Sequence, residues 1–200
     1  SFMKNKKNDI TLNWVALAIV IIYTFVAFRL TKSEIQFLSK WTFSLDEQAV
    51  ASQDSSNLVS FRLGDTLGYF STAGNFAYKY QIPLLKNGKL ANSTISSNFW
   101  TIYDAESSNF TICNPDGSKV VKISAQGNPF IQEDKLFLFT LGGSSFINYD
   151  LSGKELWRSE GYVPIISFSS SAAGTVVGYA DGEVRCLTNS GDLAFSMYPG

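Results

Sequence analysis

The chain has 200 residues, of which 45% are hydrophobic, 14% aromatic and 16% charged, which is enough to build a core and argues against disorder. Its net charge of −1 gives no basic surface for nucleic-acid phosphates. Histidine is absent, which removes the commonest general base and the commonest transition-metal ligand. Cys113 and Cys186 cannot make a zinc site alone and could form one disulfide at most; we interpret them as buried free thiols.

The N-terminal segment predicts a membrane anchor. Ser1 and Phe2 read as a tag remnant ahead of Met3, so residues 1–10 form a short tail. "TLNWVALAIVIIYTFVAFRL", residues 11–30, has a single charge near its end and about the 20 residues that cross a bilayer core. No small-residue cleavage pattern follows it, so we expect an uncleaved transmembrane signal-anchor helix.

The orientation of this anchor follows from flanking cations. Lys4, Lys6 and Lys7 precede the span, whereas Arg29 and Lys32 follow it. This modest bias favours an N-terminus in the cytoplasm. Residues 31–39 are then a linker, and the domain at 40–200 lies outside the cytoplasm.

From residue 40 onward the chain shows no helical period, and a glycine turn recurs about every 40 residues, the spacing of a repeat protein. A large apolar side chain stands four residues after each turn glycine, a candidate for docking between neighbouring units. The four glycines are Gly74, Gly117, Gly153 and Gly191, and the four side chains are Tyr78, Val121, Trp157 and Phe195.

Short apolar strands flank these turns. "LGYF", "FTIC", "FINY" and "VRCL" precede the glycines, and a turn and another strand come before each of them. A proline marks each junction between units: Pro83, Pro129, Pro164 and Pro199. Proline cannot donate to a ladder, so it belongs between strands or on an edge.

The pattern predicts an all-β fold of four-stranded antiparallel units that stack radially, which is a β-propeller. Glycine supplies the positive φ of each outer hairpin. "KWTFSLD", residues 40–46, also reads as an outermost strand, with Trp41 in the docking position. The chain then has five outermost strands but only four sets of the other three strands, which suggests an incomplete ring. The rest of a longer chain or another chain would complete it. A closed four-bladed ring is the alternative.

"YDLSGKELW" and "GTVVGYADGEVRCLTNSGDLAF" resemble the repeat of the PQQ-like, quinoprotein-type propellers, over roughly residues 40–200. The resemblance implies the fold, and it favours a bacterial protein with its propeller in the periplasm and its anchor in the inner membrane. The family includes both quinone-dependent dehydrogenases and scaffolds. The calcium ligands, catalytic aspartate and vicinal disulfide of its enzymes have no counterparts here.

The acidic pairs Asp104/Glu106, Glu133/Asp134 and Asp181/Glu183 fall in or beside turns, where solvated carboxylates are common. No nucleophile has a histidine partner. We therefore expect no catalytic, metal or cofactor site and no enzyme, but an envelope scaffold that binds proteins through its loops. The alternatives are an oxidoreductase whose site lies in further blades, and a ligand-binding sensor.

Overall fold

The computed structural model describes residues 13–26, 39, 41, 42, 44 and 57–199. The chain divides into two compact units, Ser1–Thr42 and Phe43–Gly200.

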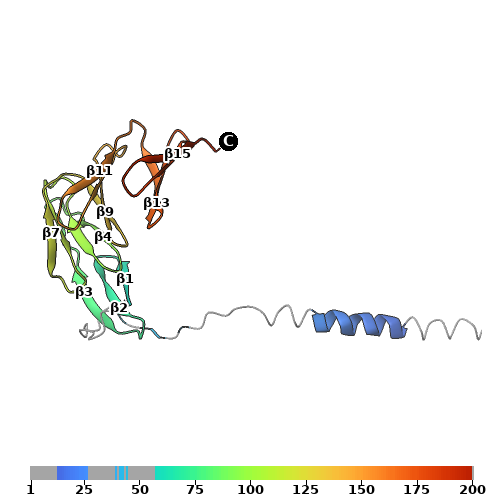
Figure 1. The fold of residues 1–200 in the computed structure, drawn as a ribbon. Coiled ribbons are helices and arrows are strands. Elements are labelled where there is room, and N and C mark those ends of the chain that lie inside the picture. The colour runs from blue at the N-terminus through green and yellow to red at the C-terminus, as the bar shows by residue number, and fades with distance from the viewer. Residues whose placement is uncertain (1–12, 27–38, 40, 43, 45–56, 200) are drawn as a thin grey trace, which may run out of the picture. The chain divides into compact units, whose positions relative to one another are not determined.

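The described part of the first unit is mainly a helix over residues 13–26, inside the predicted span of 11–30 (Figure 1). Its large apolar side chains, Trp14 and Phe25 among them, are exposed. Within the described residues, no helix has both the length and the apolar character needed to cross a membrane. The predicted span is therefore not confirmed. The tail at 1–10, the linker at 31–39 except Ser39, and the ends of the span lie outside the described residues.

The second unit is entirely β in its described part and contains four antiparallel sheets, which follow one another in chain order (Figure 1). The first sheet has the order β1(Leu58–Leu63)-β2(Thr66–Ser71)-β3(Phe76–Gln81). The second is β4(Asn92–Ile95)-β5(Trp100–Tyr103)-β6(Phe110–Cys113)-β7(Lys119–Ile123). The third is β8(Asn128–Gln132)-β9(Lys135–Phe139)-β10(Phe146–Tyr149)-β11(Glu155–Ser159). The fourth is β12(Ile165–Ser171)-β13(Gly174–Tyr179)-β14(Val184–Leu187)-β15(Leu193–Met197).

This is the all-β, four-sheet arrangement that the repeat predicted, and it is consistent with a β-propeller. The strands "FTIC", "FINY" and "VRCL" coincide with β6, β10 and β14. The first sheet has three strands in the described part of the chain, and residues 45–56 ahead of it are not described. In the predicted strand at 40–46, Trp41, Thr42 and Ser44 are described and lie in no strand; its other residues are not described.

The outer hairpin has the same backbone geometry in all four sheets. The residue three before the turn glycine donates its N–H to the carbonyl four residues ahead and accepts from the glycine N–H. The four glycines have φ between 84° and 94°, a region that disfavours other residues. A register shift of one residue follows in the outermost strand of each sheet. A turn closed by a glycine bulge explains why the docking position recurs at a fixed offset.

Two of the four prolines, Pro83 and Pro164, lie between strands, as expected, and Pro199 follows the last strand, β15. Pro83 and Pro164 accept hydrogen bonds from Ala91 and Ala180 through their carbonyls. Pro129 is instead the second residue of β8. Because β8 is the edge strand of its sheet, the missing N–H of Pro129 need not interrupt the ladder with β9.

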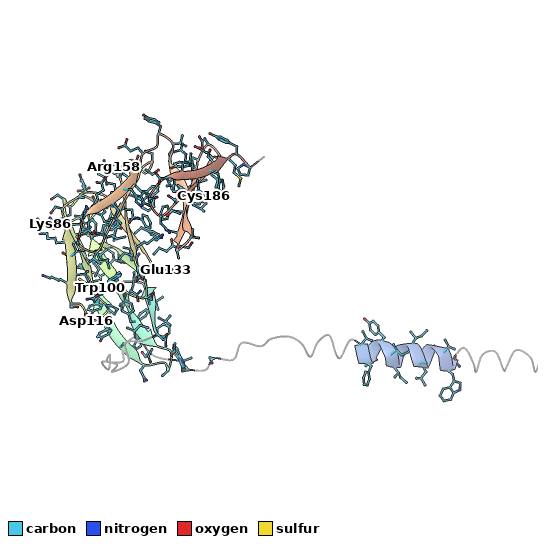
Figure 2. The ribbon with its side chains drawn as sticks, in the orientation of Figure 1. Lys86, Trp100, Asp116, Glu133, Arg158 and Cys186 are labelled. Carbon is cyan, nitrogen blue, oxygen red and sulfur yellow. The ribbon has the colours of Figure 1, made fainter. Side chains whose placement is uncertain are left out.

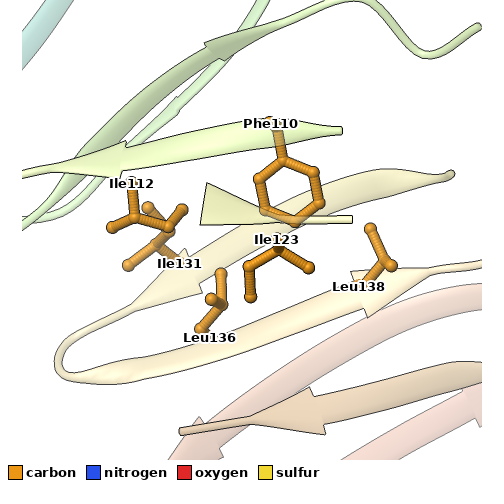
Figure 3. Close-up of a cluster of buried hydrophobic side chains, with 6 residues drawn as sticks. All are labelled: Phe110, Ile112, Ile123, Ile131, Leu136 and Leu138. Atoms are coloured by element: carbon orange, nitrogen blue, oxygen red, sulfur yellow. The ribbon is translucent and has the colours of Figure 1, made fainter. Parts of the chain in front are cut away.

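Neighbouring sheets pack face to face through apolar clusters, and their first strands are in contact, β4 with β8 and β8 with β12. Between the second and third sheets lie six buried side chains, shown in Figure 3: Phe110, Ile112, Ile123, Ile131, Leu136 and Leu138. Between the third and fourth sheets the core is aromatic, with Phe168 of β12 set edge-on to Phe137 at 4.9 Å and to Phe146 at 5.1 Å. Burial of these faces is the main force that holds the sheets in a row.

Candidate functional site

No catalytic constellation is visible in the described part of the chain. The described residues contain no group of three His, Cys, Asp or Glu side chains that could hold a metal ion. Cys113 and Cys186 are both free thiols. Burial raises the pKa of the Cys113 thiol, so this cysteine is a poor nucleophile.

The acidic pairs singled out from the sequence belong to turns. Asp104 and Asp181 each accept a hydrogen bond at 3.0 Å from the backbone N–H two residues ahead. Glu183 forms a two-pronged ion pair with Arg185. Asp134 accepts from the side-chain amide of Asn98 in the preceding sheet. These partners account for the carboxylates of Asp104, Asp134, Asp181 and Glu183.

Trp157 lies between the third and fourth sheets. Its indole Nε1 donates to the carbonyl of Asn189 at 2.9 Å, and Asn189 belongs to the outer turn of the next sheet. A Cβ atom on Gly191 in that turn would stand 2.6 Å from the indole ring. The glycine is therefore needed for close approach as well as for its φ of 87°.

Val121 occupies the equivalent position one sheet earlier. A Cβ on Gly153 would lie 3.0 Å from the Val121 side chain, so the residue predicted for docking again meets the turn glycine of the following sheet. Val121 also packs against the buried cluster between the second and third sheets.

In the first sheet a different tyrosine reaches the next turn. Tyr80, six residues after Gly74, donates its hydroxyl to the carbonyl of Pro115 at 2.7 Å and stacks on Trp100 at 4.3 Å (Trp100 is labelled in Figure 2). Its hydroxyl would lie 3.0 Å from a Cβ on Gly117. Tyr78, the predicted docking residue, packs on the cluster that contains Tyr69 and lines a pocket together with Asn114, Pro115 and Asp116 of the next turn. The longer reach of a tyrosine lets it contact the turn from two positions farther along the strand.

Phe195 and Trp41 complete the predicted set. Phe195 pairs with Cys186 at the position equivalent to Trp157, yet its side chain is 52% exposed. Trp41 is half-buried and belongs to the first compact unit.

Exposed apolar side chains gather at one end of the sheets. Antiparallel order places the loop between the second and third strands of a sheet at the same end as the connection to the next sheet. We call these loops the rim. Its exposed large apolar side chains are Leu63, Leu84, Leu90, Leu141, Tyr162 and Ile166. At the opposite end, Leu151 is exposed in an outer turn, and Val59, Leu156 and Leu193 are exposed at the starts of β1, β11 and β15.

Two pockets flank the rim loop at residues 140–145. One, of about 320 Å³, is lined by Leu141, Ile166 and Phe168 among others. The second, of about 290 Å³, includes Arg158, Glu160 and Tyr162. Tyr162 is fully exposed, at 103% of its reference area. Apolar anchors beside small pockets are typical of protein-binding surfaces.

The opposite end of the sheets is polar. A pocket of about 390 Å³ there is lined by Asn98, Asn114, Asp116 and Asp134 among others, and Figure 2 labels Asp116 and Glu133 at this end. Hydrogen bonds from Ser118 hold the pKa of Asp116 below its usual range. Because Asp116 and Asp134 already have partners, this pocket is a weaker candidate than the rim.

The rim residues were not identified from the sequence. A leucine inside the glycine- and serine-rich stretch "TLGGSS" was the available signal, because large apolar side chains are uncommon in exposed turns.

Comparison with known proteins places this geometry in context. A family model described as a beta-propeller protein matches residues 3–200. An uncharacterized protein of Treponema pallidum is 30% identical over 191 residues, which are 90% of this chain and 49% of that protein. The chain thus spans about half the length of this relative.

Solved structures share the fold at low identity. Hsv2 of Kluyveromyces lactis is 12% identical, with a TM-score of 0.53 over 72% of this chain and 48% of that one. BamB of Moraxella catarrhalis is 15% identical, with a TM-score of 0.47 over 77% of this chain and 52% of that one.

Proposed function

Because the chain belongs to a family of β-propeller proteins, we propose that it acts as a protein-interaction scaffold and binds its partner through the rim. The observation that carries this proposal is the exposed apolar set Leu141, Tyr162 and Ile166 beside two pockets. Single exposed apolar side chains are common on protein surfaces, but a group of them beside pockets is typical of a binding surface.

The chemistry of the rim favours an apolar or aromatic segment of a partner protein. Phe139 and Phe168 form the floor of one pocket, where an aliphatic side chain would be shielded from water. Arg158 and Glu160 line the other and would orient polar groups of the partner. A central apolar contact with charges at its edge is the usual anatomy of a protein interface.

The proposal includes a membrane anchor and an envelope location. The helix at 13–26 lies in the uninterrupted apolar stretch of the sequence, and apolar side chains are exposed on all its faces, as in a helix that lies in lipid. Lysines ahead of it favour a cytoplasmic N-terminus. Together with the PQQ-like character of the repeat, this supports a bacterial inner-membrane protein with its sheets in the periplasm. Carbonate extraction of membranes and protease accessibility in spheroplasts test it: release of the protein by carbonate would contradict the anchor.

The rim is tested by photo-crosslinking in living cells. A photoreactive amino acid at Tyr162 is expected to capture a defined envelope protein, whereas the same group at Leu151, on the opposite end, should not. The double variant Leu141→Ser/Ile166→Ser, with the photoreactive amino acid kept at position 162, should lose this adduct and keep its unfolding midpoint. Equal capture from both positions, or an adduct that survives the double substitution, would refute the rim as the binding surface.

We further propose that the protein has no catalytic role and no quinone cofactor. This is supported by the local turn contacts of Asp104, Asp134 and Asp181. Purified protein incubated with pyrroloquinoline quinone and Ca²⁺ should give neither a bound-quinone absorbance nor dye reduction with alcohols or sugars. A stoichiometric absorbance with turnover would favour an oxidoreductase.

A further inference from the structure

The connection between the first and second sheets is longer than the fold requires. It runs over residues 82–91, about twice the length of the connections at 124–127 and 160–164 that join the later sheets. The extra residues form a small hairpin at 84–90 with the sequence "LLKNGKL", which we call the lysine hairpin. Because a shorter segment joins the other sheets, the length of this one is not explained by the connection alone.

Backbone hydrogen bonds hold the lysine hairpin in one shape. Leu85 donates its N–H to the carbonyl of Lys89 at 2.7 Å and accepts from the N–H of Gly88 at 2.9 Å, which is the turn geometry of the outer hairpins. The side-chain oxygen of Asn87 accepts from the N–H of Lys89 at 3.0 Å. Leu85 also packs against the buried cluster that contains Leu67. The hairpin is therefore fixed to the first sheet and presents its outer side chains in a set arrangement.

Two leucines stand side by side on the exposed face of the hairpin. Leu84 and Leu90 form a β-bridge, and residues opposite each other in an antiparallel pair point to the same side. Leu84 is 69% exposed and Leu90 40% exposed. The turn after β1 adjoins the connection, because Ile82 donates its N–H to the carbonyl of Asp65, and Leu63 beside that turn is 59% exposed. The two neighbouring loops thus expose three leucines.

The same two loops carry an excess of positive charge. Lys86, which is labelled in Figure 2, and Lys89 are exposed, and within residues 57–199 neither forms an ion pair. Arg62 is exposed at the end of β1. The carboxylate of Asp65 accepts from Gln81 Nε2 at 2.7 Å, and it is the one acidic side chain on these loops. Cations among exposed leucines make this part of the rim amphipathic.

We propose that the lysine hairpin docks on a membrane surface that contains anionic phospholipids. Leu84 and Leu90 would enter the interface, and the two ammonium groups would meet the phosphates. Lysine suits this position because its aliphatic stem lies along apolar surface while its charge reaches the headgroups. A protein partner is less favoured here, since protein interfaces are depleted of lysine and enriched in aromatic residues and arginine. Tyr162 and Arg158, in the other half of the rim, have that composition.

This contact goes beyond the proposed protein binding and does not require the N-terminal helix to be an anchor. Two leucines and two lysines give a weak and reversible contact by themselves. Any tether that keeps the chain at a membrane raises the effective concentration of the hairpin there and strengthens the contact. Docking would hold the protein-binding half of the rim beside the lipid surface, within reach of a membrane-bound partner.

The purified full chain reconstituted with lipid vesicles tests the proposal. An environment-sensitive fluorescent amino acid replaces Leu84. In vesicles that contain phosphatidylglycerol its emission should shift to the blue, and high salt should reduce the shift. Vesicles of phosphatidylcholine alone should give little change. The same fluorescent residue at Leu151, an exposed leucine at the opposite end of the sheets, should respond to neither lipid.

Charge reversal tests the two lysines. Lys86→Glu/Lys89→Glu should lower the ratio of docked to free hairpin at least tenfold, as read from the emission at position 84. Lys119→Glu/Lys122→Glu changes the net charge equally at two exposed lysines of β7 and should have little effect. The proposal would be overturned by no blue shift in anionic vesicles, by an equal shift in both kinds of vesicle, or by equal effects of the two double variants. The comparison of the two lipids needs no charge variant, so it stands even where a variant misfolds.

Two further readouts separate this proposal from the proposed function. The fluorescent residue at Val20 reports on the helix: a response at Val20 without one at Leu84 would keep the anchor and overturn the hairpin contact. The photo-crosslink at Tyr162 reports on the protein partner. If Lys86→Glu/Lys89→Glu removes that adduct and Leu84 shows no response to lipid, the hairpin belongs to the protein-binding surface and the membrane contact is refuted.

Discussion

The indole of Trp157 packs so closely on the outer turn of the fourth sheet that Gly191 has no room for a side chain. A Cβ on Gly191 would stand 2.6 Å from Cγ of the indole, and the indole Nε1 donates to the carbonyl two residues before that glycine. The outermost strand of one sheet thus restricts the turn residue of the next sheet to glycine. This coupling explains why both features recur together in the sequence.

Gly191→Ala should lower the free energy of unfolding by about 3 kcal/mol, because the new methyl group meets the ring and the backbone keeps a left-handed φ. Gly182→Ala is the matched control: its φ is 90° and a Cβ there has no neighbour within 4 Å. The control should lower the free energy of unfolding by only about 1 kcal/mol, because it adds the backbone strain without the contact with the ring. Urea titration followed by tryptophan fluorescence measures both. Equal losses would mean that the ring contact does not restrict residue 191.

Trp157→Ala should cost about 3 kcal/mol of stability, because the indole packs edge-on to Phe137 and Phe146 and leaves a gap when removed. Trp157→Phe keeps part of the packing but loses the hydrogen bond to Asn189, which is worth about 1 kcal/mol. Thermal unfolding by circular dichroism at 218 nm is the measurement, paired with the crosslinking assay at Tyr162. Loss of the adduct in a variant with unchanged stability would indicate that Trp157 contacts a partner directly.

The sequence predicted the sheets well because glycine turns with a following bulge impose a fixed register. It was less informative where length and reach decide: the side chain nearest to Gly117 is Tyr80, two residues beyond the predicted Tyr78, since a tyrosine hydroxyl extends past its own strand position. The first strands of the sheets, such as β4 with its sequence "NSTI", lack apolar alternation. They were predicted only from the number of strands expected in each unit. Exposure of the rim residue Ile166 could not be predicted, because a strand pattern does not reveal whether a neighbour covers it.

Asp150 should make the outer turn of the third sheet sensitive to acid. Its Oδ1 accepts from the Ser152 hydroxyl at 2.6 Å and from the backbone N–H groups of Ser152 and Lys154. These bonds, the one from the Ser152 hydroxyl first, hold the pKa of Asp150 below its ordinary 3.8. A lowered pKa in the folded state adds stability at pH values above 3.8, and that stability is lost as the pH falls through the folded-state value.

The wild type should therefore be more stable than Asp150→Ala at pH 7, and the difference should shrink below pH 4. Urea unfolding at a series of pH values measures it. Glu160→Ala, at an exposed carboxylate in the connection to the fourth sheet, is the control and should show little difference at any pH. A gap between Asp150→Ala and the wild type that grows towards low pH would contradict the assignment of these bonds.

Lys135 should stabilise the contact between the third and fourth sheets. Its ammonium donates to the carbonyl of Ser171 at 2.6 Å, to Asn189 Oδ1 at 2.7 Å and to the Ser170 hydroxyl at 3.2 Å. All three acceptors belong to the fourth sheet or its outer turn, whereas Lys135 begins β9.

Lys135→Met keeps the aliphatic stem and removes the charge, so it should cost about 1–2 kcal/mol, the value of hydrogen bonds from a charged donor with some exposure to solvent. Lys154→Met, in an exposed turn of the same sheet, should cost little. Amide hydrogen exchange adds a readout of location: protection should fall in the loop at 171–173 and in the turn at 188–191, and stay unchanged in β5 and β6. Uniform loss of protection over the second, third and fourth sheets would indicate general destabilisation, and the ammonium would then not be a specific link between two sheets.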